Sequence, residues 1–273
     1  MDVGMDARYS YMKVEGYNLR YLEQGDRKKD KHILLIHGLG GSIMSWSRNI
    51  PYLAEYFHVV ALDMLGFGRS DKPRIEYDMQ LYVKIIKGVV DNLLGKDKVS
   101  IVGSSLGGQI ACEFTLSNID RVDRLVLVSP AGFTPVSFKG TRRLKDYTKI
   151  FSVKDVRELR GLLASVHGTP NDEYVEWMYE YINMENAEHA FLSALRNSAK
   201  AKRLTRRFKR ITESVRTLVI WGKKDEIIPV KYASYFINID NCRVILLEHC
   251  SHRPHVEDSR LFNEYVREFL VGT

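Results

Sequence analysis

The residues with the clearest chemical potential lie in the run Val102-Gly103-Ser104-Ser105-Leu106-Gly107-Gly108, where two hydroxyls stand side by side. Only Ser105 has glycine both two positions before it and two positions after it. Glycines at these places allow the tight strand-to-helix turn that exposes a nucleophilic serine. The N-terminus of the following helix stabilises developing negative charge. Ser105 is therefore the candidate nucleophile, and an idle serine in a glycine-rich turn is the alternative.

A serine nucleophile needs a base, and three histidines stand in the run Glu248-His249-Cys250-Ser251-His252-Arg253-Pro254-His255. His252 lies in the expected loop between the last strand and the closing helix, so it is the candidate base. His249 and His255 are interpreted as structural. The three-residue spacing resembles a metal site, but Pro254 interrupts any helix and no carboxylate pattern joins the histidines. We expect no metal and no cofactor.

The acid that orients the base is expected in the run Trp221-Gly222-Lys223-Lys224-Asp225-Glu226, just past a buried strand. Asp225 lies on the side of the sheet where open α/β sheets form their sites, so it is the candidate acid. Glu226 is interpreted as its solvated neighbour. The alternative acid position, Ser129-Pro130-Ala131-Gly132, has no carboxylate. The chain order serine, aspartate, histidine differs from the orders in chymotrypsin and subtilisin.

A glycine-rich loop, His37-Gly38-Leu39-Gly40-Gly41-Ser42, follows the first buried strand. The backbone N–H of Leu39 or Gly40 is expected to supply half of an oxyanion hole. The N–H of Leu106, directly after the serine, supplies the other half. His37 is expected to fix this loop by hydrogen bonds rather than to act as a base.

A second loop, Asp63-Met64-Leu65-Gly66-Phe67-Gly68-Arg69-Ser70, follows the next strand. Its glycines suit a tight loop beneath the site. Asp63 is a carboxylate at a strand end, but it is assigned a structural role and stays outside the predicted catalytic set.

The elements that must position these residues can be read from apolar patterns. Six short runs, apolar at nearly every position, are typical of strands buried on both faces. The six runs cover residues 33–36, 59–62, 99–102, 125–128, 218–221 and 244–247, and an opening hairpin is expected from residues 9–14 and 19–22. Helical patterns lie at residues 79–94, 106–116 and 256–270. The alternation predicts an α/β fold with a doubly wound, mostly parallel sheet.

One long stretch interrupts this alternation. From Gly132 to about Val215 no buried strand is expected, only helical patterns at residues 153–163, 172–182 and 187–208. The stretch is too long for a loop in a compact domain. We therefore predict an inserted helical cap at residues 133–215 on a core formed by residues 1–132 and 216–273.

The formal charge of +7 comes from this insertion. Between Thr134 and Thr217 there are 17 Lys and Arg against 10 Asp and Glu, and the charges of the remaining chain cancel. The densest part contains Lys200, Lys202, Arg203, Arg206, Arg207, Lys209 and Arg210, with Leu204, Phe208 and Ile211 between them at helical spacing. This pattern predicts one amphipathic helix with a basic, solvated outer face. Attraction of an anionic substrate or surface is the alternative, and no nucleic-acid partner is expected because no recognised module is present.

Composition limits the class of protein further. A hydrophobic content of 45% is that of an ordinary globular chain rather than a disordered one. The first twelve residues hold no apolar run long enough for a signal peptide, and no stretch approaches the roughly eighteen apolar residues of a membrane span. Cys112, Cys242 and Cys250 show neither CxxC nor zinc-ligand spacing, so a reduced, cytoplasmic setting is expected. The oligomeric state stays open.

The motifs HGLGGS, DMLGFGRSD, GSSLGG, WGKKDEIIP and CSHRPHVED together resemble the α/β-hydrolase family over nearly the whole chain. The resemblance implies a helical cap after the sixth strand of the core sheet. It also implies an oxyanion hole built by the His-Gly loop and the residue after the serine. The family usually has glycine before the catalytic histidine, where this chain has Ser251.

Within the family the chain is similar to carboxylesterases and to the carbon–carbon bond hydrolases of aromatic-ring degradation. The second group typically has asparagine before the nucleophile and tryptophan after the histidine, where this chain has Ser104 and Arg253. Haloalkane dehalogenases and epoxide hydrolases place aspartate at the position of Ser105. The resemblance therefore favours a carboxylesterase-like serine hydrolase that cleaves small-molecule esters through an acyl-enzyme.

Two other hypotheses stay open. One is hydrolysis of a carbon–carbon bond in a vinylogous ketone acid, with basic residues of the cap holding the substrate carboxylate. The other is a non-catalytic binding protein on the same fold, although such proteins usually lose a member of the triad and all three members are present here.

Overall fold

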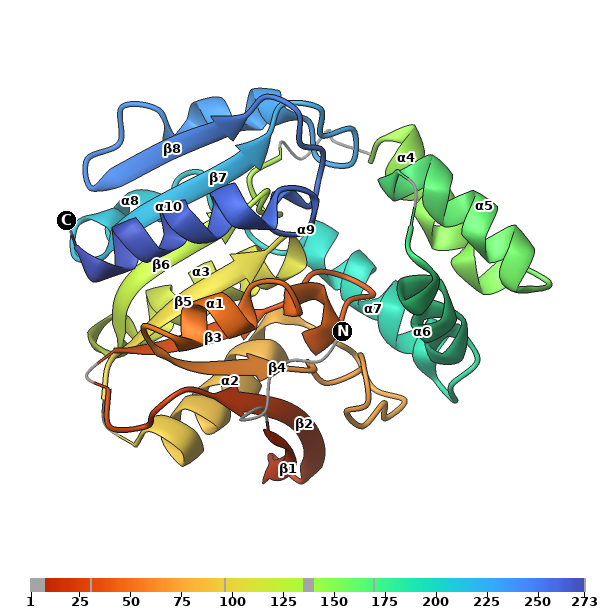
Figure 1. Ribbon diagram of the computed structural model, residues 1–273, viewed down its shortest axis with the longest axis horizontal. Helices are drawn as coiled ribbons and strands as arrows, with labels where there is room; N and C mark the ends of the chain where they lie inside the picture. Colours follow the sequence, from red (N-terminus) through yellow and green to blue (C-terminus); the bar gives the residue numbers. More distant parts are fainter. Residues whose placement is uncertain (1–7, 30, 96, 135–139, 169, 273) are drawn as a thin grey trace.

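The computed structural model describes residues 8–29, 31–95, 97–134, 140–168 and 170–272. Residues 1–7, at the start of the chain, and residues 135–139, at the start of the expected cap, lie outside the described residues. The described chain forms a central sheet with helices on both faces and a further group of helices at one end of the strands (Figure 1).

The described strands form one eight-stranded sheet in the order β1-β2-β4-β3-β5-β6-β7-β8. The strands are β1 (Arg8–Val14), β2 (Tyr17–Gln24), β3 (His32–Ile36), β4 (His58–Leu62), β5 (Val99–Ser104), β6 (Val122–Val128), β7 (Arg216–Gly222) and β8 (Cys242–Leu247). The hairpin β1–β2 is antiparallel and joins β4 in antiparallel pairing, whereas all pairs from β4 to β8 are parallel. The predicted doubly wound, mostly parallel sheet is confirmed.

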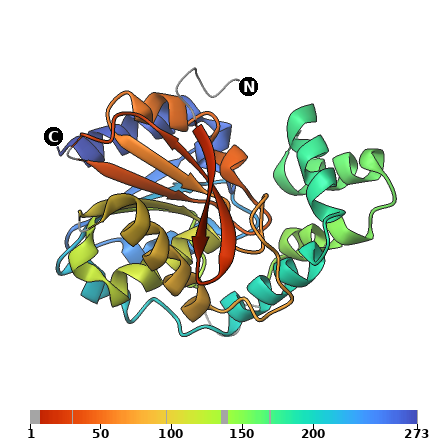
Figure 2. The same cartoon turned by 90° about the horizontal axis from the view of Figure 1, so that it is seen from below.

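Helices cover both faces of the sheet (Figures 1 and 2). They are α1 (Ile50–Ala54), α2 (Met79–Leu94), α3 (Leu106–Ser117), α8 (Phe208–Thr212), α9 (Pro254–Glu257) and α10 (Ser259–Val271), with 3₁₀ helices at Ile43–Trp46, Ile119–Arg121 and Val230–Phe236. On β3, Ile33 and Leu35 pack in the core under α1 and α10, while Leu34 and Ile36 pack in the core under α2 and α3. Every residue of β3 is buried because helices cover both faces of the sheet, and this explains the uninterrupted apolar run from Ile33 to Ile36.

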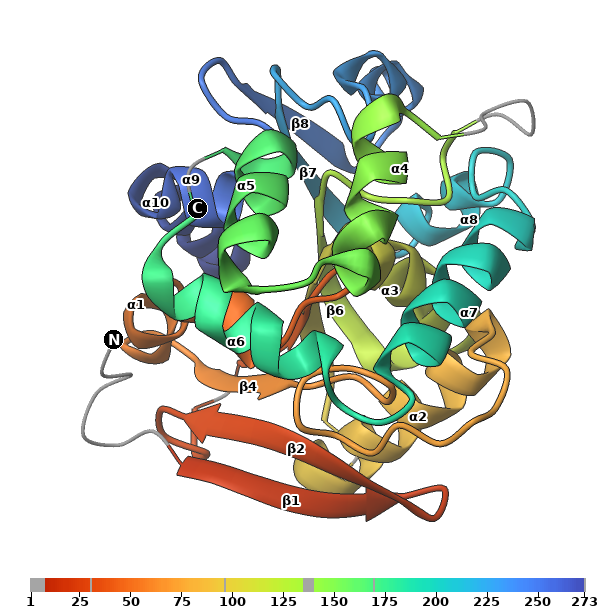
Figure 3. The same ribbon diagram turned by 90° about the vertical axis from the view of Figure 1, so that its right-hand side faces the viewer.

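A group of helices connects β6 to β7 and lies over the carboxyl ends of the parallel strands (Figure 3). It contains α4 (Arg142–Tyr147), a 3₁₀ helix at Thr148–Ser152, α5 (Val156–His167), α6 (Asp172–Ile182) and α7 (Ala187–Lys200). No helix within the described ranges is long and apolar enough to cross a membrane. These helices are called the cap helices below.

The prediction of a single amphipathic helix across the basic segment is wrong. Helix α7 ends at Lys200, because Ala201 has an extended ψ of 154° that breaks the helical path. The N–H of Leu204 then donates to the carbonyl of Gly132, at 3.0 Å, instead of to a helical carbonyl. A new short helix, α8, begins at Phe208. Leu204 and Phe208 are nevertheless buried, so the spacing identified the inward positions correctly.

Polar contacts tie the basic segment to the core helix α3. The Gln109 side-chain amide donates to the carbonyl of Ser198 at 3.2 Å, and the Ser198 hydroxyl donates back to the amide oxygen of Gln109. Arg207 donates two hydrogen bonds to the Glu113 carboxylate, at 2.6 and 2.8 Å. The C-terminal part of the cap is thus held against the helix that begins at the serine turn.

The fold favours the neutral form of three buried histidines. His58 Nδ1 lies 2.9 Å from Nδ1 of His32, and His58 Nε2 lies 2.8 Å from the Glu23 carboxylate. Burial lowers the pKa of His58, of the fully buried His37 and of the fully buried His255. Burial has this effect because the charged imidazolium loses more hydration than the neutral ring.

We expect the free energy of unfolding to decrease when the pH is lowered from 7.5 to 5.5. In the unfolded chain histidines titrate near a pKa of about 6.5, so below that pH the unfolded state binds more protons than the folded state. Urea unfolding at both pH values measures the difference. His255→Phe, which keeps a ring against Trp46, should reduce the difference. Equal free energies at the two pH values would contradict the argument.

Candidate active site

Ser105 lies in a sharp turn between β5 and α3. Its φ is +52°, a left-handed backbone that costs free energy for any residue with a side chain. A Cβ on Gly103 would lie 2.4 Å from the carbonyl oxygen of Gly107, and a Cβ on Gly107 would lie 2.3 Å from that of Ile36. Larger residues at these two positions would force the ends of β3 and β5 away from the start of α3. The turn is the one that the glycine spacing predicts.

The two adjacent serines have different places in this turn. Ser104 is the last residue of β5 and pairs with Val128 of β6. Ser105 occupies the turn itself, where its N–H donates to the carbonyl of Val128 at 2.9 Å and its own carbonyl accepts from the N–H of Ala131 at 3.0 Å. Both serines line the same cavity. The strained backbone distinguishes Ser105 as the candidate nucleophile.

Asp225 and His252 form a buried pair. The Asp225 carboxylate lies 2.8 Å from His252 Nδ1, and its side chain is completely shielded from solvent. It also accepts hydrogen bonds from the Trp221 indole and from the N–H groups of Ile227 and Ile228, each at 2.9 Å. Because an ionised carboxylate only accepts, Nδ1 of His252 carries the proton. Nε2 is left with the lone pair that a general base needs.

The His252 imidazole and the Ser105 hydroxyl line one cavity. Within the described part of the chain, the Ser105 hydroxyl makes no hydrogen bond, so it is available to an acceptor in the cavity that it shares with His252. In enzymes of this type the catalytic hydrogen bond often tightens only when substrate is bound. A Cβ on Gly38 would lie 3.2 Å from Cβ of Ser105, so glycine at this position keeps the His-Gly loop close to the hydroxyl.

Two hydrogen bonds fix the orientation of the peptide group between Gly38 and Leu39 in the His-Gly loop. The carbonyl of Gly38 accepts a hydrogen bond from His37 Nδ1 at 2.7 Å and another from the N–H of Gly41 at 3.0 Å. A peptide is planar and trans, so the N–H of Leu39 must point opposite to that carbonyl. Leu39 lines the cavity, and Gly40 is not among the described residues that do. The Leu39 N–H is therefore the better placed of the two candidate oxyanion donors.

The other donor candidate is the N–H of Leu106, the first residue of α3. Leu106 lines the cavity, and the first N–H groups of a helix have no acceptor within that helix. In the described residues neither the Leu106 N–H nor the Leu39 N–H has a protein acceptor. Two such donors beside a serine hydroxyl can hold a developing oxyanion.

His37 and Asp63 support loops, which is the part predicted for them. His37 Nε2 accepts from the N–H of Met64 at 3.0 Å, so both ring nitrogens are engaged by backbone. Asp63 accepts from the N–H of Ile43 at 2.7 Å and from that of Arg69 at 2.9 Å. Neither side chain is among the described residues that line the cavity.

The other two histidines of the His252 loop have separate partners. His249 Nε2 lies 2.9 Å from the Asp258 carboxylate at the surface. His255 is buried with its ring 4.4 Å from the Trp46 ring, measured between centroids, and it borders the cavity. In the described residues no group of three or more histidine, cysteine or acidic side chains is placed to hold a metal ion.

Helix α4 contributes contacts that the sequence patterns do not reveal. Its six residues make less than two turns, too few for a helical period, and the N-capping Thr141 is its only local signal. The Tyr147 hydroxyl donates to the carbonyl of Leu39 at 3.4 Å. Arg143 forms an ion pair with Glu226, so the prediction that Glu226 is simply solvated was incomplete. Helix α4 thus contacts both the His-Gly loop and the loop that carries the acid.

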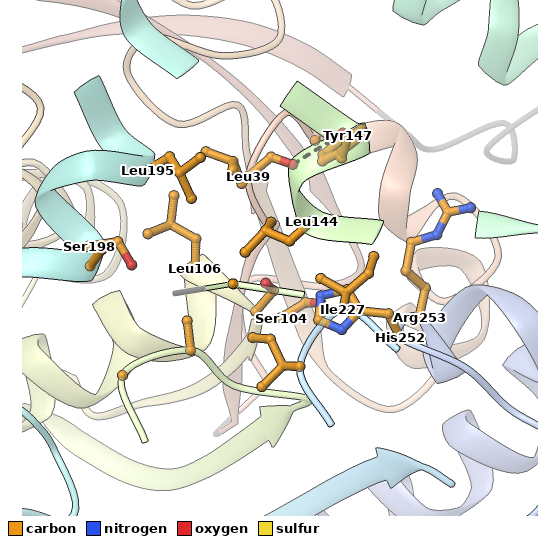
Figure 4. A pocket seen from close by; sticks show the side chains of 18 of the residues that line it. Leu39, Ser104, Leu106, Leu144, Tyr147, Leu195, Ser198, Ile227, His252 and Arg253 are labelled. Atoms are coloured by element: carbon orange, nitrogen blue, oxygen red, sulfur yellow. Dashed lines mark hydrogen bonds between the residues drawn. The ribbon is translucent and has the colours of Figure 1, made fainter. Parts of the chain in front are cut away.

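The cavity has a volume of about 360 Å³ and is lined by residues of the core loops and of the cap helices. Figure 4 shows Leu39, Leu106, Leu144 and Leu195 in its wall, with Ser104, Ile227, His252 and Arg253 nearby. Lys145, Arg203 and Arg253 also line it, whereas no aspartate or glutamate does so in the described residues. An apolar cavity with three cations and no carboxylate suits a mainly apolar substrate that carries negative charge.

The chain is similar in sequence to known proteins. A sequence model of the family described as "alpha/beta hydrolase fold" matches residues 31–259. A 2-hydroxy-6-oxo-6-(2'-aminophenyl)hexa-2,4-dienoic acid hydrolase from Metapseudomonas resinovorans is 29% identical over 95% of this chain and 90% of that protein. The predicted resemblance to the α/β-hydrolase family is confirmed.

Two solved structures are also similar. The meta-cleavage product hydrolase of Pseudomonas fluorescens IP01, in complex with acetates, has a TM-score of 0.81 and 26% identity, covering 95% of this chain and 96% of that one. A membrane phospholipase A described as a bacterial virulence factor has the same TM-score and identity, covering 98% of this chain and 86% of that one.

Gly40→Ala tests the contact between the cap and the His-Gly loop. Gly40 has φ +68°, and a Cβ there would lie 2.6 Å from the Tyr147 hydroxyl and 2.9 Å from the Phe191 ring. We expect the displaced loop to lower kcat for a p-nitrophenyl ester by roughly 10²-fold, the usual cost of losing an oxyanion donor. Gly16→Ala is the matched control, since Gly16 has φ +86° with no atom within 4 Å of an added Cβ. Equal kcat in the two variants would show that the contact between the cap and the His-Gly loop does not affect catalysis.

Proposed function

The chain belongs to the alpha/beta hydrolase fold family, and on that premise we propose that it is a serine hydrolase of anionic ketone substrates. The proposed reaction is hydrolysis of a carbon–carbon bond next to the ketone of a vinylogous ketone acid. The observation that carries this proposal is the cavity, where Ser105 and His252 share one space with three cations and no described carboxylate. The relative from Metapseudomonas resinovorans, which is named for such an acid, supports the same substrate class.

This proposal reverses the order of the two enzyme hypotheses drawn from the sequence. Ser104 and Arg253 favoured esters, because carbon–carbon bond hydrolases typically have other residues at those positions. Those two substitutions now weigh less than a likeness over nearly the whole chain to proteins named as a dienoic acid hydrolase and as a meta-cleavage product hydrolase. The cationic cavity adds a physical reason, since a neutral ester needs no positive charge in its binding site.

The proposed reaction begins with attack by Ser105 on the ketone carbonyl. His252 Nε2 accepts the hydroxyl proton as the oxygen–carbon bond forms. Asp225, bonded to Nδ1 at 2.8 Å, holds the ring in the required tautomer and stabilises the imidazolium that results. In this step the developing oxyanion accepts hydrogen bonds from the N–H groups of Leu106 and of Leu39 (or Gly40).

Collapse of the tetrahedral intermediate breaks the carbon–carbon bond. The electron pair of that bond passes into the conjugated acid fragment. The carbon atom released by the cleavage takes the proton from His252, and the acid fragment leaves the site. A water molecule then gives its proton to His252 and attacks the acyl carbon; the bond from that carbon to the Ser105 oxygen breaks, His252 returns the proton to Ser105, and the carboxylic acid product is released. Every bond broken is matched by one formed, and no cofactor takes part.

We also propose that the cap helices belong to a functional unit with the boundaries expected from the sequence, residues 133–215 on a core of residues 1–132 and 216–273, and that this unit includes α8, which packs on the sheet. Its helices supply Leu144, Tyr147 and Leu195 to the cavity, whereas the core supplies Ser105 and His252. In this arrangement the core performs the chemistry and the cap selects the substrate.

Ester hydrolysis is the second candidate. The same attack by Ser105 would open an ester, with the alcohol taking the proton from His252. The likeness to a membrane phospholipase A, at a TM-score of 0.81, specifically favours this candidate.

Replacing the nucleophile tests both candidates together. Ser105→Ala should lower kcat by on the order of 10³–10⁶-fold, as in other triad enzymes, because the attacking oxygen is removed. Ser104→Ala, which removes the neighbouring hydroxyl from the same cavity, should retain most of the activity. A fluorophosphonate probe should label the wild type and Ser104→Ala but not Ser105→Ala. Labelling of Ser105→Ala would show that another residue is the nucleophile.

A direct comparison of substrates separates the two candidates. We expect kcat/KM to be higher for 2-hydroxy-6-oxo-6-(2'-aminophenyl)hexa-2,4-dienoic acid than for p-nitrophenyl butyrate, because only the former carries a carboxylate for the cationic cavity. Product formation is followed by chromatography for both. Fast ester turnover with no cleavage of the acid would exclude the carbon–carbon reaction and leave ester hydrolysis.

A further inference from the structure

Arg253 borders the catalytic centre directly. It follows His252 in the chain and lines the same cavity, where its side chain extends away from the imidazole along one side of the pocket (Figure 4). Its guanidinium lies over the ring of Tyr174, on α6 of the cap, at 4.9 Å from the ring centroid. A guanidinium stacked on an aromatic face keeps its edge N–H groups available for other acceptors. The side chain is therefore held in place while its donors stay free.

These donors have no acidic partner in the described residues. Nε of Arg253 is buried and makes no hydrogen bond. Glu257, the acidic residue of the same loop, binds the N–H groups of Ser251 and Arg253, at 2.6 and 2.9 Å, rather than the guanidinium. A buried cationic donor without a partner is costly, so its presence beside a reactive centre needs an explanation.

The charge of Arg253 reaches the groups around the cavity. Burial is the main cause of the lowered pKa of His255, and the positive charge of Arg253 lowers that pKa further. Burial raises the pKa of Tyr147 well above its ordinary value, and the charge of Arg253 opposes that rise. Both groups line the cavity, so a negative group bound there would lie in the field of Arg253.

The two other cations of the cavity have different surroundings. Arg203 donates to the carbonyl of Ala199 at 3.1 Å, close to the end of α7, where a cation stabilises the exposed carbonyls of a helix. Lys145 is exposed, so water screens its charge. Only Arg253 combines a fixed guanidinium, a buried free donor and a place next to His252.

We propose that Arg253 is the carboxylate-binding residue of the cavity and that the ligand it takes is an organic acid with an apolar body. The planar guanidinium can pair with both carboxylate oxygens, which orients the acid as well as binding it. This inference rests on the proposed function and deepens it. It places the acid end of the substrate beside His252 and the apolar body along the leucines of the cavity.

Calorimetric titration with two inert ligands tests the proposal without relying on turnover. The acid 4-phenylbutanoate and its neutral amide have the same apolar body, so only the carboxylate distinguishes them. The wild type should bind the acid more tightly than the amide. Arg253→Met should weaken binding of the acid roughly 10- to 100-fold and leave the amide unchanged, because a charged hydrogen-bonded pair is lost.

The matched control is Arg203→Met, which removes the other arginine of the same cavity and should leave the preference for the acid intact. Arg253→Lys keeps the charge without the planar fork, and it should restore part of the affinity even if Arg253→Met folds poorly. Equal binding of acid and amide by the wild type, or absence of acid binding, overturns the proposal. So does loss of the preference in Arg203→Met alone. Because no outcome depends on catalysis, failure of the carbon–carbon reaction would be recognised separately.

Discussion

The left-handed backbone at Ser105 is the constraint on which the rest of the site depends. A non-glycine residue in this conformation costs about 1–3 kcal/mol, so the surrounding structure must hold it. The hydrogen bond to the carbonyl of Val128 ties the turn to β6, and the contact of Gly107 with the carbonyl of Ile36 ties it to β3. One turn therefore fixes the relative positions of the serine, the His-Gly loop and the start of α3.

The polar groups around that turn follow a simple rule. The side chains that hold other groups in place are fully hydrogen-bonded. The Asp225 carboxylate accepts from four donors, and both ring nitrogens of His37 are engaged. In the described residues the groups without a protein partner include the Ser105 hydroxyl, the N–H groups of Leu39 and Leu106, and Nε of Arg253. Free hydrogen-bonding capacity is thus present at the atoms that a carbonyl substrate would meet, which is the preorganisation that lowers a charged barrier.

How much of this the sequence could predict depends on how local each feature is. The strands, the hairpin and the turn at Ser105 follow from apolar runs and from glycines, so they were predicted with nearly correct limits. Helix α4 is too short to show a period, and the break at Ala201 depends on the bond between Leu204 and Gly132, which are 72 positions apart in the chain. The pairing of Arg143 with Glu226 is likewise tertiary, and no local pattern encodes it. The sequence therefore identified candidate residues, but it could not identify the contacts that hold them.

Those tertiary contacts join the cap helices to the loops around Ser105. Tyr147 bonds the loop of Leu39, Arg143 pairs beside Asp225, and Tyr174 supports the arginine that follows His252. Each of the loops that flank the serine is therefore in contact with a cap helix. A change in the cap that reshapes the cavity also moves the loops that carry the candidate catalytic residues, because the same cap side chains contact both. Substrate choice and rate are consequently coupled, and a cap residue that touches one of these loops should alter kcat as well as KM.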